Sequence, residues 1–230
     1  MLPRVAGLAL FLVVTAAGAA SAATPSGYYY LNARQLDLTV LLPPPPDLGS
    51  AQARADEQQV AAAISTRSAA QLAEAQEATQ RSVFFFAPAI GPNFTAQRLP
   101  LTALFFKRIA SDVHRLVLAA KAYWERPRPG GGGKKHASYP SGHAAFAASS
   151  AIVLSQLLPA KRDAIFSQAR TFAENRILLG LHYPTDVAAG WTAGTLAVFV
   201  MMHDSAFRRD FEQVQAELRR AQLLPAARGK

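Results

Sequence analysis

The chain has no cysteine among its 230 residues, which excludes a disulfide framework, thiolate chemistry and cysteine-ligated metal sites. It also lacks internal repeats and any segment in which apolar and polar residues alternate as they do in half-buried strands. Beyond the N-terminal segment, no apolar stretch is long enough to span a membrane, since the run Trp191–Met202 has only twelve residues. Half of the residues are nevertheless apolar, so a disordered chain is excluded.

The first residues have the three parts of a secretory signal peptide. Arg4 gives a weakly positive start, Val5–Val14 is an apolar run, and Ala20–Ala22 matches a small-residue cleavage site. An uncleaved membrane anchor is the alternative, but the apolar stretch is short and ends in small residues rather than basic ones. We therefore expect a signal peptide over residues 1–22, cleaved after Ala22 or Ala23. The mature protein is then soluble, periplasmic or secreted, and without stable membrane insertion.

The formal net charge is +9, and it falls to +8 when the signal peptide removes Arg4. A basic surface suits nucleic acid, anionic membranes or small anionic substrates. The basic residues are spread along the chain, and the sharpest cluster lies between two motifs described below: Arg126, Arg128, Lys134, Lys135 and His136. This distribution favours a small anionic substrate and predicts no nucleic-acid partner.

The rest of the chain divides into an arm and one domain. Residues 23–50 form an extended arm, because the consecutive prolines Pro43–Pro46 impose polyproline II and forbid a helix. We expect this arm to pack on the body of the protein. Residues 51–230 form a single helical domain, with helices predicted over residues 51–81, 101–124, 141–158, 161–179, 184–203 and 205–224. The fold class is all-α, a compact multi-helix bundle.

The helix over 101–124 has the clearest amphipathic pattern. One apolar stripe at spacings of three and four is formed by Phe105, Ile109, Val113, Leu116, Ala120 and Tyr123. Pro127 and Pro129 end this helix, so Lys121 lies in its last turns and Arg128 in the loop beyond.

Three short segments have the residue types that phosphoryl chemistry requires: Lys121–Pro129, Ser138–His143 and Asn175–Asp186. A phosphoryl group in transfer needs fixed cations around its oxygens, a nucleophile on one side and a proton donor on the other. The segments supply three cations, two histidines and one carboxylate: Lys121, Arg128, Arg176, His143, His182 and Asp186.

The predicted helix starts give these side chains a geometry. Pro140 opens a helix whose free N–H groups can bind an anion, and Gly142 lets an oxyanion approach the backbone, with Ser141 as a hydroxyl donor. Pro184 begins another helix, which puts His182 just before it and Asp186 in its first turn. Asp186 can then hydrogen-bond one imidazole nitrogen and leave the other as a nucleophile.

Each of these features has a simpler explanation when it is taken alone. Pro-Ser-Gly can be an ordinary helix start, His182 a polar residue in a turn, and Arg176 a solvated helix charge. The combination is what favours a site for one anionic ligand.

In order along the chain, the motifs read Lys-x6-Arg-Pro, Pro-Ser-Gly-His and Arg-x5-His-x3-Asp. This pattern resembles the signature of the type 2 phosphatidic acid phosphatase superfamily, over about residues 100–200. The signal peptide, the Leu-Leu-Pro-Pro-Pro-Pro arm over 41–46 and the pair Ser138-Tyr139 are similar to one branch, the class A bacterial non-specific acid phosphatases.

The resemblance implies a helical bundle of the kind shared with vanadium haloperoxidases, no cofactor, no metal, and two-step hydrolysis of small phosphomonoesters. It implies that His182 attacks phosphorus and becomes phosphohistidine, that Asp186 orients it, and that His143 protonates the leaving alcohol and then activates water. The phosphate-binding residues that it implies are Lys121, Arg128, Ser141, Gly142 and Arg176. Inorganic phosphate or vanadate is expected to inhibit.

The sequence departs from the family pattern at three places. Asn175 stands where the family usually has Ser, Ala144 follows His143 where the branch tends to have Thr, and only ten residues separate Pro129 from Pro140. The short, glycine-rich loop leaves substrate preference open. We interpret Arg126 as an additional cation on the rim of the pocket.

Three other functions are compatible with the motifs: a lipid phosphate phosphatase, a vanadium-dependent haloperoxidase, and a phosphate-binding protein without catalysis. The preferred substrate, phosphate transfer to alcohols and self-association into a homo-oligomer stay open at this point.

Overall fold

The computed structural model describes residues 27–31, 35–131 and 137–224, and these segments form helices and loops without any β-strand. The predicted signal peptide lies outside the described residues, as does the 132–136 part of the glycine-rich loop. The helices are α1 (Leu38–Leu41), α2 (Ala51–Thr66), α3 (Ala69–Glu77), α4 (Ala87–Ile90), α5 (Pro100–Trp124), α6 (Gly142–Leu157), α7 (Arg162–Leu178), α8 (Pro184–Met201) and α9 (Ser205–Arg220). The predicted all-α fold is confirmed.

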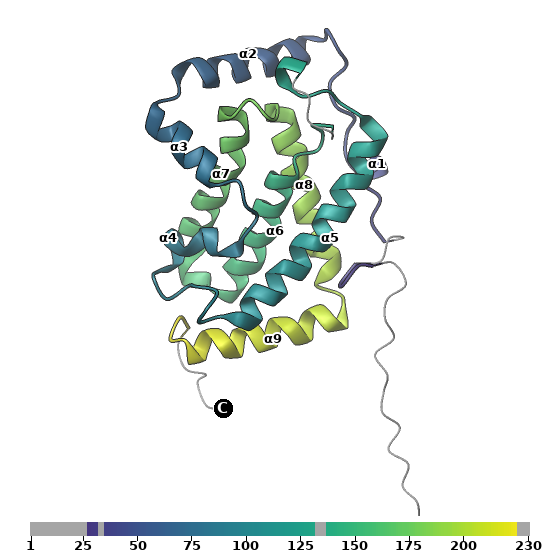
Figure 1. The fold of residues 1–230 in the computed structure, drawn as a ribbon. Helices are drawn as coiled ribbons and strands as arrows, with labels where there is room; N and C mark the ends of the chain where they lie inside the picture. Colours follow the sequence, from purple (N-terminus) through teal and green to yellow (C-terminus); the bar gives the residue numbers. More distant parts are fainter. Residues whose placement is uncertain (1–26, 32–34, 132–136, 225–230) are drawn as a thin grey trace, which may run out of the picture.

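Helix α6 lies at the centre of the bundle and packs against α5, α7 and α8, while α2 and α9 cross opposite ends (Figure 1). Its sequence is mostly alanine, serine and bulky apolar residues, and nearly every side chain from Ala144 to Leu157 is buried. A helix that is apolar on all sides belongs in the middle of a bundle. The expected helix starts near Ser141 and Pro184 are confirmed within one residue.

Two glycines of α8 allow it to lie directly against α6. A Cβ atom added to Gly190 would come within 3.0 Å of the Ser141 carbonyl oxygen, and one added to Gly194 equally close to the Ala145 carbonyl oxygen. Real Cβ atoms essentially never approach other atoms so closely. The absence of side chains here therefore brings the first turns of α8 against the start of α6.

The apolar stripe of α5 is buried as predicted from Phe105 through Ala120. The prediction was wrong for Tyr123, which is 66% exposed in the last turn of the helix. Its ring packs edge-on against that of Trp124, with 5.5 Å between the ring centres. The last residue of the stripe thus serves local packing at the helix end.

The described part of the N-terminal arm packs on the body of the protein, but it is not extended throughout, because Leu38–Leu41 form the short helix α1. The carboxylate of Asp112 in α5 accepts hydrogen bonds from the backbone N–H groups of residues 29–31. Further along, the Tyr139 hydroxyl donates to the Pro43 carbonyl oxygen at 2.5 Å. Leu38 and Leu42 beside the prolines are buried. These contacts place the arm along α5 (Figure 1).

The single helix predicted over residues 51–81 is wrong, because the chain breaks into α2 and α3 at Arg67–Ser68. Ser68 caps α3 with a capping box, in which its hydroxyl accepts from the Gln71 N–H and the Gln71 side chain accepts from the Ser68 N–H. This local arrangement satisfies the free groups at a helix start. The break lets α3 turn onto α7 (Figure 1).

The C-terminal helix α9 begins at a cap, where the Asp204 carboxylate accepts from the backbone N–H groups of Ala206 and Phe207. Its Glu217 accepts from Leu101 N and Thr102 N and so caps the start of α5.

Among the described helices, none is by itself long and apolar enough to cross a membrane. Helices α8 and α9 meet the length and composition criterion only as a pair, which is bent by 96°.

The contact between α6 and α8 can be tested with Gly194→Ala. We expect a loss of about 3 kcal/mol in the free energy of unfolding, because the added methyl group must push the two helices apart. Thr195→Ala is the matched control on the exposed side of α8, where we expect a change within about 0.5 kcal/mol. Urea unfolding of both variants measures the difference. Equal stabilities would contradict the close packing.

Candidate active site

His182 and Asp186 form a buried pair at the start of α8. Pro184 is the first residue of this helix and Asp186 the third, so His182 precedes it, as the sequence predicted. His182 Nδ1 lies 3.2 Å from Asp186 Oδ2, and the Tyr183 N–H donates to the same oxygen at 2.9 Å. Because a carboxylate only accepts, Nδ1 carries the proton. The other ring nitrogen, Nε2, is then unprotonated.

Burial lowers the pKa of His182 to about 4, although the hydrogen bond and the charge of Asp186 act in the opposite direction. For Asp186, burial raises the pKa, but the hydrogen bond and charge of His182 and the charge of Arg126 hold it below its usual value. The pair is therefore a neutral imidazole beside an ionised carboxylate at neutral pH.

Arg128 contacts the unprotonated nitrogen of His182, and the charge of Lys121 acts on the same ring. Arg128 Nη1 is 3.3 Å from His182 Nε2 and donates to the Leu181 carbonyl oxygen at 2.5 Å. Lys121 Nζ donates to the Ser138 carbonyl oxygen at 2.7 Å. Burial and then the charge of Arg128 lower the pKa of Lys121 to about 7. An anion bound between the two cations would raise it again.

Arg176 and His143 are both held by backbone carbonyl groups at the end of α3. Arg176 is 1% exposed, and its Nη2 donates to the carbonyl oxygens of Ala75 and Ala78 at 3.0 and 3.2 Å. Its Nε has no hydrogen-bond partner among the described residues. His143 Nε2 lies 3.0 Å from the Thr79 carbonyl oxygen. Burial and the charge of Arg176 hold the pKa of His143 well below its usual value.

Ser141 and Gly142 form the start of α6. Ser141 is the cap residue, and its Oγ accepts from the Ala144 N–H at 3.3 Å. Its own backbone N–H donates to the Asp186 carbonyl oxygen at 2.9 Å, which ties the start of α6 to the start of α8. All eight residues predicted for the site thus lie at the ends of α5, α6, α7 and α8 or in the loops next to these ends.

Sequence reasoning missed one cation at this helix start. The Arg81 guanidinium lies 3.6 Å from the position that a Cβ atom of Gly142 would occupy, and Arg81 Nη1 is 3.0 Å from His114 Nδ1. Arg81 follows α3 in a break of the helical pattern and belongs to no motif. No signal in the sequence separates it from the other surface arginines.

Arg126 was predicted to be a rim residue, and this prediction is wrong. The residue is only 7% exposed. Its Nη1 donates to Asp186 Oδ1 and to Thr185 Oγ1, each at 2.7 Å, and its Nη2 donates to Asp56 Oδ2 at 2.8 Å. The reason is that two buried carboxylates from different helices require a shared cation. Asp56 itself lies in α2 and is fully buried, which no pattern in the sequence predicted.

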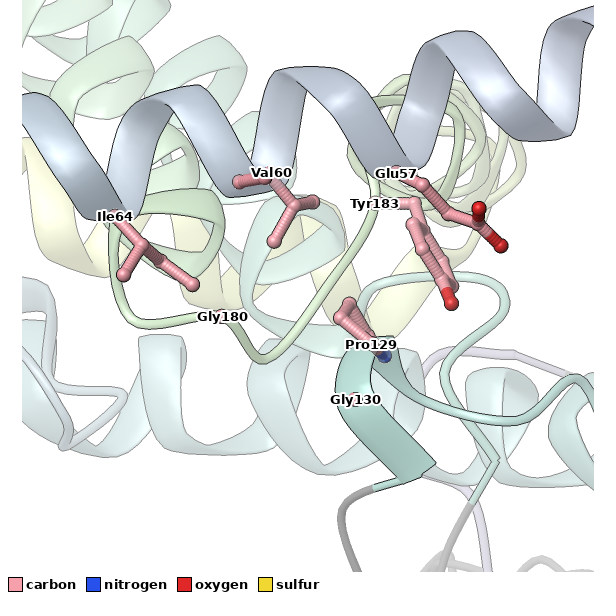
Figure 2. A pocket seen from close by; sticks show the side chains of 8 residues that line it. Glu57, Val60, Ile64, Pro129, Gly130, Gly180 and Tyr183 are labelled. Carbon is pink, nitrogen blue, oxygen red and sulfur yellow. The ribbon is translucent and has the colours of Figure 1, made fainter.

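A cavity of about 290 Å³ lies between α2 and the two loops that hold Arg128 and His182 (Figure 2). In Figure 2, the side chains of Glu57 and Tyr183 lie at one end and that of Ile64 at the other. The walls are mostly apolar and are formed by Glu57, Val60, Ala61, Ile64, Pro129, Gly130, Gly180 and Tyr183. Pro129 follows Arg128 and Tyr183 follows His182 in the chain, but none of the eight predicted site residues lines the cavity. Within the described segments, no three His, Asp or Glu side chains are grouped so as to hold a metal ion.

Comparisons with known proteins find a matching family model and similar chains. Residues 100–210 match the model of the PAP2 superfamily. The chain is 30% identical over 214 residues to an acid phosphatase of Zymomonas mobilis, covering 86% of this chain and 80% of that protein. It is 26% identical over 211 residues to a non-specific acid phosphatase of Providencia stuartii, covering 84% and 85% of the two chains.

The fold is also similar to the crystal structure of a transmembrane PAP2-type phosphatidylglycerolphosphate phosphatase from Bacillus subtilis. The TM-score is 0.51 at 23% sequence identity, and the match covers 67% of this chain and 87% of the other. At this identity the likeness concerns the fold alone. From the matched segment, the motifs within it and the relatives that match most of its length, this chain belongs to the PAP2 superfamily.

Proposed function

We propose that this protein is an exported acid phosphatase that hydrolyses small phosphate monoesters, without a metal, through a phosphohistidine intermediate. The observation that carries the proposal is the buried His182–Asp186 pair, whose free Nε2 faces Arg128 beside Lys121. The relatives named acid phosphatase support the same reaction class. Export rests on the signal-peptide pattern of residues 1–22.

His182 is the nucleophile in this proposal. Its Nε2 lone pair attacks phosphorus while the Nδ1 proton stays hydrogen-bonded to Asp186, so that the carboxylate stabilises the positive charge that develops on the ring. The P–O bond to the alcohol breaks as the N–P bond forms. Water then attacks the phosphohistidine, releases phosphate and regenerates the free imidazole.

Fixed cations stabilise the equatorial oxygens of the phosphoryl group. Lys121 and Arg128 lie on the side of His182, and the unpartnered Nε of Arg176 is a further donor. The Gly142 backbone and the Ser141 hydroxyl add neutral donors at the start of α6. Donors that are fixed before the substrate arrives cost no reorganisation during the reaction.

His143 is the general acid and then the general base. Burial and Arg176 keep it neutral in the free protein, but a bound phosphate dianion beside it raises its pKa and favours the imidazolium. The imidazolium can protonate the leaving alcohol, and the neutral ring can afterwards accept a proton from water. Inorganic phosphate and vanadate, which occupy the same donors, are expected to inhibit.

The nucleophile is tested by His182→Ala. We expect kcat for p-nitrophenyl phosphate, measured without added metal, to fall by about 10³-fold or more, because the proposed nucleophile is removed. His203→Ala is the control, since this histidine is exposed at the end of α8 and should leave kcat unchanged.

Full activity of His182→Ala would contradict the proposed mechanism. The same purified wild-type protein is assayed with nucleotides, with phosphatidate, and for halide oxidation after vanadate loading. Preference for phosphatidate would favour a lipid phosphate phosphatase, and halide oxidation a haloperoxidase. Tight phosphate binding without turnover would indicate a binding protein.

The neutral state of His182 also makes folding depend on pH. The folded protein holds the pKa of this ring at about 4, against an ordinary value of 6.5 in the unfolded chain. Between these pH values the unfolded state binds more protons than the folded state. The contribution of the neutral His182 ring to the free energy of unfolding is therefore complete above pH 6.5. It is lost progressively as the pH falls towards 4.

We accordingly expect His182→Asn to lose less unfolding free energy than the wild type between pH 6.5 and 4. Urea unfolding at intervals of half a pH unit measures the two slopes. His203→Gln is the control and should retain the wild-type slope, because its side chain is exposed in the folded state. Identical slopes for wild type and His182→Asn would show that His182 is not held neutral.

A further inference from the structure

We propose that Arg126 and Asp56 are positioning residues for the His182–Asp186 pair, so that helix α2 completes the catalytic machinery. The inference rests on the proposed function and extends it to residues outside the three motifs. Asp56 also lies outside the segment 100–210 that matches the PAP2 superfamily. Four observations about the contacts of Arg126 support it.

The Arg126 side chain is fixed on three sides. One end of its planar guanidinium donates to Asp186 Oδ1 at 2.7 Å, and the other end donates to Asp56 Oδ2 at 2.8 Å. The face of the guanidinium lies over the Tyr183 ring, 4.1 Å from its centre. A guanidinium that is held in this way has a fixed fork geometry, which a flexible ammonium group cannot reproduce.

The fixed guanidinium determines how the Asp186 carboxylate is oriented towards the histidine. Arg126 occupies Oδ1, whereas Oδ2 receives His182 Nδ1 at 3.2 Å and the Tyr183 N–H at 2.9 Å. Rotation of the carboxylate would break all three contacts. Arg126 thus holds the hydrogen bond that sets the proton on Nδ1 and leaves Nε2 free for phosphorus.

Asp56 prevents Arg126 from neutralising Asp186. Both carboxylates are fully buried and share one guanidinium, so the group of three has a net negative charge. If Asp56 were neutral, the full charge of Arg126 would be paired with Asp186 alone. The support that Asp186 gives to a positive charge on His182 would then decrease, because charges interact strongly at a buried site.

Thr185 links the two carboxylates to the helix start. Its hydroxyl accepts from Arg126 Nη1 at 2.7 Å and donates to Asp56 Oδ2, and its backbone N–H donates to Asp56 Oδ1 at 3.3 Å. Asp56 therefore also accepts at the start of α8, where a carboxylate is stabilised by the helix dipole. This contact attaches α2 directly to the helix that positions His182.

A substitution at Asp56 leaves the other charged or titratable residues that face His182 in place. They are Asp186 from α8, Lys121 from α5, Arg128 from the loop after α5 and His143 from α6. A change in the titration of His182 in an Asp56 variant therefore comes from the lost Asp56 charge and its effect on Arg126 and Asp186.

The test compares Asp56→Asn and Arg126→Lys with the wild type on p-nitrophenyl phosphate. We expect kcat to fall by about 10- to 100-fold, as for other residues that orient a catalytic group, with KM changed by less than about twofold. In Asp56→Asn the acid limb of the kcat/KM profile should move to lower pH, because His182 becomes harder to protonate. The substrate is the same in each profile, so its own titration cancels.

The matched control is Asp210→Asn, which removes the other described Arg–Asp ion pair between helices, Arg108–Asp210 at 2.6 Å. We expect it to lower the melting temperature without moving kcat or the pH profile. If Asp56→Asn behaves in the same way, α2 is only a structural support and the inference is wrong. If Asp56→Asn does not fold, Thr185→Val takes its place, and unchanged kcat and pH profile in that variant would equally overturn the inference.

The failure of the proposed function would give a different result. In that case the wild type would hydrolyse p-nitrophenyl phosphate no faster than His182→Ala does. The network is then tested without activity, by following the His182 ring signals with pH by NMR. A lower pKa of His182 in Asp56→Asn supports the coupling, and an unchanged pKa contradicts it.

Discussion

The hydrogen bonds of Asp186 are the interaction on which the site depends. Its two carboxylate oxygens contact His182, Tyr183 and Arg126, while its backbone carbonyl oxygen accepts from the Ser141 N–H. One residue thus orients His182, the proposed nucleophile, and joins the starts of α8 and α6. These starts can meet only because Gly190 has no side chain where α8 touches the Ser141 carbonyl group. Helix packing and the geometry of the site have the same cause.

The N-terminal helices contribute to the site through buried polar contacts. Asp56 in α2 holds Arg126, and the carbonyl groups of Ala75 and Ala78 at the end of α3 hold Arg176. The segment that matches the PAP2 superfamily begins only at residue 100. In the proposed mechanism, the four-helix core therefore supplies the reacting groups, and the preceding helices fix their orientation. In a buried site, a charged side chain that lacks such partners is costly, which explains why α2 and α3 pack so closely over it.

Most of the helices and the motif residues could be predicted from the sequence, because local signals determine them. Pro184 begins α8, and Gly180 ends the preceding helical segment with a positive φ of 65°. The break at Ser68 was missed, although its capping box with Gln71 was present in the sequence. The burial of Arg126 could not be predicted, because it depends on Asp56, which is seventy residues away in the chain. Tertiary pairing of charges leaves no periodic pattern.

Trapping the intermediate shows whether His182 forms a covalent bond to phosphorus. The wild type is mixed with p-nitrophenyl phosphate, quenched within milliseconds in base, where phosphohistidine is stable, and digested for mass spectrometry. We expect one added phosphoryl group, on the peptide that contains His182, and none in His182→Ala. Turnover with no phosphorylated His182, or with the phosphoryl group on another residue, would contradict the proposed mechanism.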